Sequence, residues 1–226
     1  MEKDLNQLEI IIKTWLQDPL DRELDTTLVY ADQLLATLQA GLQQDTGAGK
    51  TLGPLIGQVR GMQKKLRALP EIDWYQTGKG QLAIGHKPGQ KLITDLKLLH
   101  TGFILTLLCE SEGALEIKQM ATRVGIQWLW FPMTSADPPT ENRLPEIRQL
   151  FDQLADALDN QARVYIHCSA GIHRTGMITY LFLRYTGLSA DAARQTLQQL
   201  RQETWQAVGT DRLQWADQFV VRLLVS

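Results

Sequence analysis

One short segment combines a thiol, a guanidinium and several small residues at close spacing. Residues 167–176 read His-Cys-Ser-Ala-Gly-Ile-His-Arg-Thr-Gly, so that five residues separate Cys168 from Arg174. An apolar stretch at 164–166 precedes the segment and a helical pattern begins near Thr175, which predicts a strand, a tight loop and the start of a helix. Such a turn points successive backbone N–H groups at one place, which therefore favours an anion.

The residue types of this segment also predict a reaction. A free cysteine is mostly neutral near pH 7, whereas a thiol at a helix N-terminus can have a pKa of about 3.5–7.5 and react as a thiolate. We therefore expect Cys168 to attack the phosphorus of a bound phosphate in line. Arg174 is expected to hold two phosphate oxygens with its planar fork. Thr175 is expected to donate its hydroxyl to the sulfur, and His167 to support the loop from behind.

The segment resembles the active-site signature of the protein tyrosine phosphatase superfamily, which is Cys, five residues, Arg, then Ser or Thr. Residues 71–226 are similar to its compact dual-specificity type in length and in order of elements. The resemblance implies that Cys168 is the nucleophile of a cysteine-dependent phosphatase and that Arg174 binds phosphate and stabilises the transition state. The residues whose loop backbone would hold the phosphate are Ser169, Ala170, Gly171, Ile172, His173 and Arg174. Nothing in this mechanism calls for a metal or another cofactor.

A carboxyl group must protonate the leaving oxygen and later deprotonate the attacking water. The family carries this acid on a loop after a strand, some thirty or more residues before the cysteine. Asp137 follows the apolar stretch 126–131 and precedes Cys168 by 31 residues. The family's Trp-Pro-Asp triplet is absent, so Asp137 is assigned by position. Glu141 is the alternative, although the helix dipole also explains an acidic residue at that place.

Four further features have a possible role in function or in structure. His173 either adds a cation beside the substrate or faces solvent. Residues 110–112 follow a predicted strand and either line the cleft or form a solvated turn, and we favour the turn. Cys109 ends an apolar run without a basic partner, which predicts an inert buried thiol. The stretch 47–51, Gly-Ala-Gly-Lys-Thr, is similar to a nucleotide-binding loop but has Gln44 where that loop has glycine, so we expect a turn between helices.

Periodicity predicts how the chain positions these residues. Residues 1–70 carry three amphipathic helical stripes and no strand pattern, which predicts an all-helical extension and a candidate small bundle. Strands alternating with helices follow from residue 71, which predicts an α/β domain with a mainly parallel central sheet flanked by helices. The expected strands are 81–85, 102–109, 126–131 and 163–167, and the expected helices are 113–123, 144–158, 175–186, 190–203 and 211–224.

The composition limits the partners of the protein. A net charge of −2 gives no global field that attracts nucleic acid or an anionic membrane. The two cysteines indicate neither a disulfide scaffold nor a zinc site. The N-terminus is not typical of a signal peptide and no run is long enough to span a membrane, which predicts a cytoplasmic protein. A basic stripe, Arg60, Lys64, Lys65 and Arg67, fits a solvated helix face better than a binding patch.

The preferred substrate is therefore a phosphorylated protein, mainly at phosphotyrosine and also at phosphoserine or phosphothreonine. Lipid phosphates are disfavoured because no lysine lies between Cys168 and Arg174. Two alternatives stay open. In the first, the protein acts on RNA 5′-phosphates or nucleotides, with the basic stripe as an RNA contact. In the second, from another class, it binds phosphate without turnover. Residues 1–70 are a candidate surface for self-association.

Overall fold

The computed structural model describes residues 2–20, 23–44 and 49–225. They form two compact units, Met1–Pro70 and Glu71–Ser226. Most of the predicted turn between the second and third helices, including Gly47 and Ala48, lies outside the described residues. Within the described ranges, no helix has both the length and the apolarity that crossing a membrane requires.

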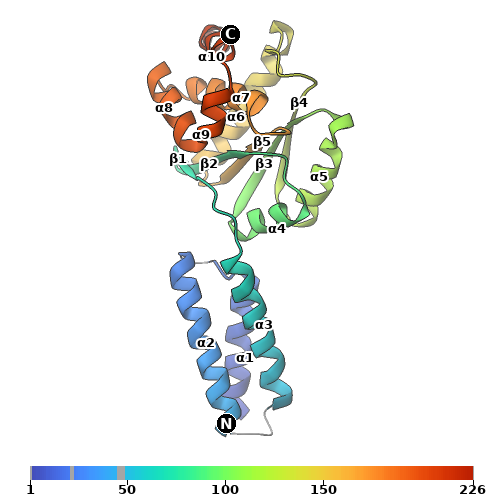
Figure 1. The fold of residues 1–226 in the computed structure, drawn as a ribbon, viewed down its shortest axis with the longest axis vertical. Helices are drawn as coiled ribbons and strands as arrows, with labels where there is room; N and C mark the ends of the chain where they lie inside the picture. The colour runs from blue at the N-terminus through green and yellow to red at the C-terminus, as the bar shows by residue number, and fades with distance from the viewer. Residues whose placement is uncertain (1, 21–22, 45–48, 226) are drawn as a thin grey trace. The chain divides into compact units, whose positions relative to one another are not determined.

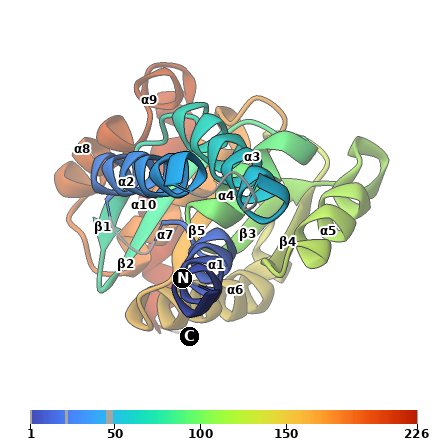
Figure 2. The same ribbon diagram turned by 90° about the horizontal axis from the view of Figure 1, so that it is seen from below.

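The first unit consists of three helices that run side by side (Figures 1 and 2). They are α1 (Glu2–Gln17), α2 (Leu24–Gln44) and α3 (Gly49–Arg67). Residues at three- and four-residue spacing bring their apolar faces into one shared core, as the stripes predict. The buried members are Ile12, Trp15, Ala31, Leu34, Leu35, Leu38, Leu52, Leu55, Ile56, Val59 and Leu66. Gly49 to Thr51 were expected in the turn between helices but form the first turn of α3. The element before them is the helix α2 and not a strand, which agrees with the rejection of a nucleotide-binding loop.

The second unit is built on a five-stranded sheet of order β1-β2-β5-β3-β4. Its strands are β1 (Tyr75–Thr77), β2 (Gly80–Gly85), β3 (Thr101–Leu108), β4 (Gln127–Met133) and β5 (Arg163–His167). β1 pairs antiparallel with β2, whereas β2, β5, β3 and β4 run parallel to one another. The predicted fold class, a mainly parallel sheet with helices and a helical N-terminal extension, is confirmed.

Alternation along the strands gives the sheet two apolar faces. Val164 and Ile166 of β5 join the core formed with α6 (Leu144–Asp159), α7 (His173–Tyr185), α8 (Ala190–Leu200) and α10 (Thr210–Val225). Tyr165, between them, joins the core formed with α4 (Gln90–Leu98) and α5 (Ala114–Arg123) on the opposite face. Helices therefore cover both faces of the sheet, as expected for parallel strands (Figure 1).

Several elements differ from the sequence prediction. β1 and α4 were not anticipated, because β1 has three residues and α4 follows Gly89 without a capping side chain. The sequence predicts one helix over 190–203, whereas the structure has α8 and then α9 (Gln202–Ala207). The two are separated at Arg201, whose backbone is extended, with φ −168° and ψ 111°. No glycine or proline marks this break, so local sequence rules cannot locate it.

The parallel strands place four loops at one edge of the sheet. The segments that leave their carboxyl ends are 86–89 after β2, 168–172 after β5, 109–113 after β3 and 134–140 after β4. Ligands of parallel α/β sheets bind at this edge. The predicted nucleophile and acid loops are therefore on the same side of the sheet, although the two are far apart in the chain.

Candidate active site

The loop 168–172 connects β5, in the centre of the sheet, with the first turn of α7. Cys168 is 3% exposed and belongs to a pocket of about 190 Å³. The lining residues are Thr134, Ser135, Ala136, Cys168, Ser169, Ala170, His173 and Arg174. The predicted loop residues Gly171 and Ile172, the helical Thr175 and the candidate acid Asp137 are not among them.

The Cys168 thiol has a pKa below its ordinary value because hydrogen bonds to the sulfur outweigh burial. Burial, the largest single effect, raises the pKa, since it disfavours the charged form. The Thr175 hydroxyl and the backbone N–H groups of Thr175, Gly171 and Ile172 lower the pKa by donating to the sulfur. The Gly171 nitrogen lies 3.2 Å from Sγ. Among the described residues the buried Thr175 hydroxyl has no other hydrogen-bond partner, so its proton is available to the thiolate.

Arg174 is held in place by a carboxylate that the sequence prediction had assigned to a solvated turn. Its Nη1 and Nη2 each donate to one oxygen of Glu112, both at 2.7 Å, and Nη1 also donates to the Met133 carbonyl at 2.7 Å. Arg174 is 11% exposed and Glu112 31%. The preference for a solvated turn at 110–112 is thus wrong for Glu112, because β3 lies beside β5 and brings its C-terminal end to the loop.

The Glu112 pair leaves part of the guanidinium for a ligand. Arg174 has five N–H donors, and Glu112 and Met133 accept three of them. The Nε–H and one Nη2–H remain, and these two lie on the same edge of the planar group. The hydrogen bonds from Arg174, only partly opposed by burial, lower the pKa of Glu112 to about 2. Glu112 therefore stays ionised and Arg174 presents a fixed two-pronged donor edge for phosphate oxygens.

Cys168 is also held by its backbone carbonyl, through a chain of buried polar groups. His167 Nδ1 lies 3.1 Å from that carbonyl oxygen, which can only accept, so Nδ1 carries the proton. His167 Nε2 then accepts from the Thr106 hydroxyl at 2.9 Å, and Thr106 accepts from the Trp128 indole at 2.9 Å. Burial, with Lys87 and other nearby cations, lowers the pKa of His167 to about 4 despite the opposing Cys168 hydrogen bond. His167 is thus a neutral support of the loop, as expected.

The loop after β4 borders the pocket, but its acidic residue does not line it. Asp137 is exposed, and its carboxylate accepts a hydrogen bond from the Ser135 hydroxyl at 2.8 Å. The loop is anchored by Arg212, whose Nε donates to the Ala136 carbonyl at 2.8 Å. The alternative, Glu141, is paired with Arg222 of α10. The loop backbone therefore lies beside Cys168, while the Asp137 carboxylate points to a neighbour within its own loop.

The structure also places His173 and Cys109. His173 is exposed and lines the pocket, so its side chain faces solvent at the mouth of the site, and its role as a cation beside the substrate stays a prediction. Cys109 is only half-buried, and its sulfur contacts Glu112 and Ser111 at 3.1 Å each. The expectation of a buried thiol is therefore wrong, because the strand ends at Leu108 and the next turn opens to solvent.

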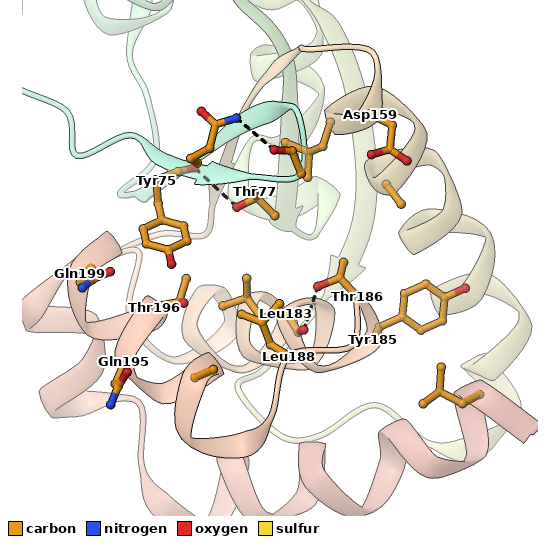
Figure 3. Close-up of a pocket in the computed structure, with 16 residues that line it drawn as sticks. Tyr75, Thr77, Asp159, Leu183, Tyr185, Thr186, Leu188, Gln195, Thr196 and Gln199 are labelled. Carbon is orange, nitrogen blue, oxygen red and sulfur yellow. Dashed lines mark hydrogen bonds between the residues drawn. The ribbon is translucent and has the colours of Figure 1, made fainter.

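A larger cavity lies elsewhere in the second unit (Figure 3). It has a volume of about 780 Å³ and lies between β1, the C-terminal ends of α6 and α7, and α8. Its lining includes Tyr75, Tyr185 and Asp159 but no lysine, arginine or histidine. A cavity without cations is a poor site for a phosphate dianion. The smaller pocket at Cys168 is therefore the candidate active site.

Comparisons with known proteins agree with this geometry. The sequence model of the family described as "Dual specificity phosphatase, catalytic domain" matches residues 94–210. A kinase-associated phosphatase, KAP, has a similar structure, with TM-score 0.58, 18% identity, and coverage of 69% of this chain and 97% of that one. PTPMT1 gives TM-score 0.53 and 18% identity over 67% and 96%. Tk-PTP gives 0.52 and 17% over 66% and 95%. No curated protein matches the sequence.

Proposed function

The chain belongs to the dual-specificity phosphatase family, and from this we propose that it hydrolyses phosphate monoesters through a phosphocysteine at Cys168. The observation that carries the proposal is the thiol itself. Although it is almost fully buried, its pKa lies below the ordinary value because the Thr175 hydroxyl and the loop N–H groups, with Gly171 N at 3.2 Å, together outweigh burial. The same N–H-lined loop and the free edge of Arg174 are suited to a tetrahedral dianion.

Two displacements at phosphorus complete the proposed reaction. In the first, the Cys168 thiolate attacks phosphorus, the bond to the ester oxygen breaks, and Asp137 protonates the departing oxygen. In the second, water attacks the phosphocysteine, Asp137 accepts its proton, and the phosphorus–sulfur bond breaks. Thr175 stabilises the returning thiolate with its hydroxyl proton. Arg174 and the loop backbone bind the equatorial oxygens, where charge is concentrated in both transition states.

We further propose that the substrate is a phosphorylated protein, with phosphotyrosine preferred and phosphoserine or phosphothreonine accepted. The pocket lining contains one arginine, Arg174, and no lysine, which suits a single phosphate group. PTPMT1, a structural neighbour, has been crystallised with PI(5)P, so a lipid substrate is a necessary comparison. Self-association through residues 1–70 and a cytoplasmic location stay predictions.

A substrate panel tests this choice. We expect kcat/KM for a phosphotyrosine peptide to exceed that for phosphoserine peptides, PI(5)P vesicles and 5′-phosphorylated RNA. The basic stripe of α3 is exposed, so RNA needs its own control. If RNA were the substrate, it would have the highest kcat/KM of the panel, and this value would fall steeply with rising salt. A higher kcat/KM for the lipid or the RNA would overturn the proposal that the substrate is a protein. It would not contradict the proposed phosphatase reaction.

Asp137→Ala should lower turnover most for substrates with poor leaving groups. An aryl oxygen leaves as a stabilised anion, whereas an alkyl oxygen needs a proton. We therefore expect a loss of about 10²–10⁴-fold on alkyl phosphates and a much smaller loss on p-nitrophenyl phosphate. The measurement is kcat for a series of esters of differing leaving-group pKa.

Glu141→Ala is the matched comparison, because Glu141 is the other carboxylate near the loop and is paired with Arg222. It should leave the dependence on leaving group as it is in the wild type. Equal losses on all esters in Asp137→Ala, with a selective loss in Glu141→Ala, would move the acid to Glu141.

A further inference from the structure

Two peptide units of the phosphate loop each have one end at the nucleophile and the other end at the α8–α9 junction. The unit joining Ala170 and Gly171 donates its N–H to the Cys168 sulfur at 3.2 Å. Its carbonyl, which points the opposite way, accepts from Arg201 Nη1 at 2.9 Å. Arg201 therefore holds the carbonyl end of this peptide dipole, while the N–H end contacts the sulfur.

The next peptide unit repeats the arrangement. The Ile172 N–H, at one end of this unit, is among the groups that lower the pKa of the Cys168 thiol. The Gly171 carbonyl, at the other end of this unit, accepts from Arg201 Nη1 at 3.1 Å and from the Thr204 hydroxyl at 2.7 Å. Thr204 is fully buried, so the bond it makes is shielded from competing water.

The loop conformation makes these carbonyl partners necessary. Gly171 has φ +72°, and a Cβ there would lie 2.2 Å from the Gly85 carbonyl oxygen. The chain is thus pressed against β2 in a left-handed turn whose carbonyls face away from the pocket. Rotation of either peptide unit would turn a carbonyl oxygen toward the thiolate and remove an N–H donor. Donors behind the loop oppose that rotation, and a cation at the carbonyl end also polarises the peptide.

The break between α8 and α9 places the Arg201 and Thr204 donors next to the loop carbonyls. Arg201 is extended at this break, so its side chain leaves the helical path and reaches the loop carbonyls. Thr204 follows one turn later in α9 and contacts the same Gly171 carbonyl. Neither residue belongs to the segment 167–176 or lines the pocket at Cys168.

We propose that Arg201 and Thr204 are positioning residues that hold two loop peptides with their N–H groups toward the Cys168 sulfur and so keep the nucleophile ionised. The proposal rests on the assignment of Cys168 as the nucleophile. It deepens that assignment, because it adds to the signature segment a second set of residues that stabilise the thiolate, beginning at Arg201, 33 residues after Cys168.

Other groups around the sulfur contribute to the same field, and each stays constant in the test below. Arg174 of α7 carries its positive charge beside the sulfur and is balanced by Glu112, while Arg201 is balanced by Glu203. His167 is neutral. The remaining titratable groups of the surrounding elements are His86, Lys87, Asp137, Tyr165 and His173.

The test is the pH dependence of alkylation of Cys168 by iodoacetamide, followed by mass spectrometry so that the half-buried Cys109 is counted separately. Only the thiolate reacts, so the midpoint reports the thiol pKa without any substrate. We expect Arg201→Met and Thr204→Val each to raise the midpoint by about one unit. Below the midpoint, alkylation should slow by about tenfold, and the acid limb of kcat/KM should move by the same amount.

Two variants separate positioning from general stability. Thr204→Ser retains the hydroxyl and should restore the wild-type midpoint, whereas Thr204→Val has the same shape without it. Arg194→Gln removes another arginine of the α8 region, one that contacts Asp191 and Asp217, and should leave the midpoint unchanged. Circular dichroism confirms that each protein is folded. If Arg201→Met does not fold, Arg201→Lys and the Thr204 pair carry the test.

An unchanged midpoint in folded Arg201 and Thr204 variants would overturn the proposal. So would a loss of activity by the same factor at every pH, because that result describes a merely structural role. Failure of the proposed phosphatase function would look different: the wild-type thiol would still alkylate as a thiolate, but no phosphate ester would be hydrolysed.

Discussion

Cys168→Ser should abolish turnover, with kcat on p-nitrophenyl phosphate falling by at least about 10⁴-fold. Serine has nearly the size of cysteine, but its hydroxyl does not ionise in the neutral range, and the groups placed at the sulfur are hydrogen-bond donors rather than bases. The hydrogen bonds that lower the thiol pKa cannot lower that of an alcohol enough to compensate. Initial-rate kinetics measure the effect.

The same variant should still bind phosphate, because the loop amides and Arg174 are unchanged. Loss of the negative sulfur next to a dianion is expected to strengthen binding of a phosphotyrosine peptide, measured by calorimetry. Cys109→Ser is the matched control, since it removes the other thiol and keeps a hydroxyl beside Glu112, and most of the turnover should remain. Unchanged hydrolysis in Cys168→Ser, together with resistance to vanadate, would disprove the nucleophile assignment.

Arg174→Lys should lower kcat by about 10²–10³-fold although it preserves the charge. The guanidinium binds Glu112 and Met133 with three donors and retains two more on one edge for phosphate. A lysine ammonium is a single point with three donors, so it cannot reach Glu112 and two phosphate oxygens together. Kinetics on an aryl phosphate should show the loss mainly in kcat, because the transition state needs the fork more than the ground state does.

Glu112→Gln separates the charge of Arg174 from its orientation. Glutamine keeps the size of the side chain but replaces one acceptor oxygen with an NH₂ group that repels the guanidinium. We expect a loss of about 10²-fold, since small misplacements of a catalytic group have costs of this size. Because the Glu112 pKa is about 2, its protonation cannot produce the acid limb of the wild-type pH profile. Wild-type kcat in Glu112→Gln would show that Arg174 needs no carboxylate support.

Much of the fold and of the site could be predicted from local sequence. The continuous apolar run Val164, Tyr165 and Ile166 predicts a strand buried on both faces. The next ten residues predict a phosphate loop before a helix. These features depend on residues within one turn or one strand of each other, which is the range over which periodicity and turn chemistry act. The spacing of Cys168 and Arg174 is a property of one continuous segment and needs no knowledge of the fold.

Only the tertiary structure decided what supports that segment. Glu112 and Arg174 are 62 residues apart, and Thr204 lies 33 residues after Gly171. The residues next to a carboxylate after a strand, or next to a threonine in a helix, do not predict its distant hydrogen-bond partner. One signal was available for Glu112, namely its place just after a predicted strand. Its use required the strand order, in which β3 lies directly beside β5.

The sequence by itself thus determined the fold class and predicted the nucleophile and the phosphate-binding loop, because each depends on short-range patterns. The tertiary structure decided the partner of Arg174, the break at Arg201 and the position of the acid loop. The physical reason is the same in each case. Strand order and helix packing bring together side chains from distant segments, and local sequence patterns do not predict which of these side chains interact. At Cys168, local sequence supplies the sulfur and the N–H donors, and distant residues hold those donors in place.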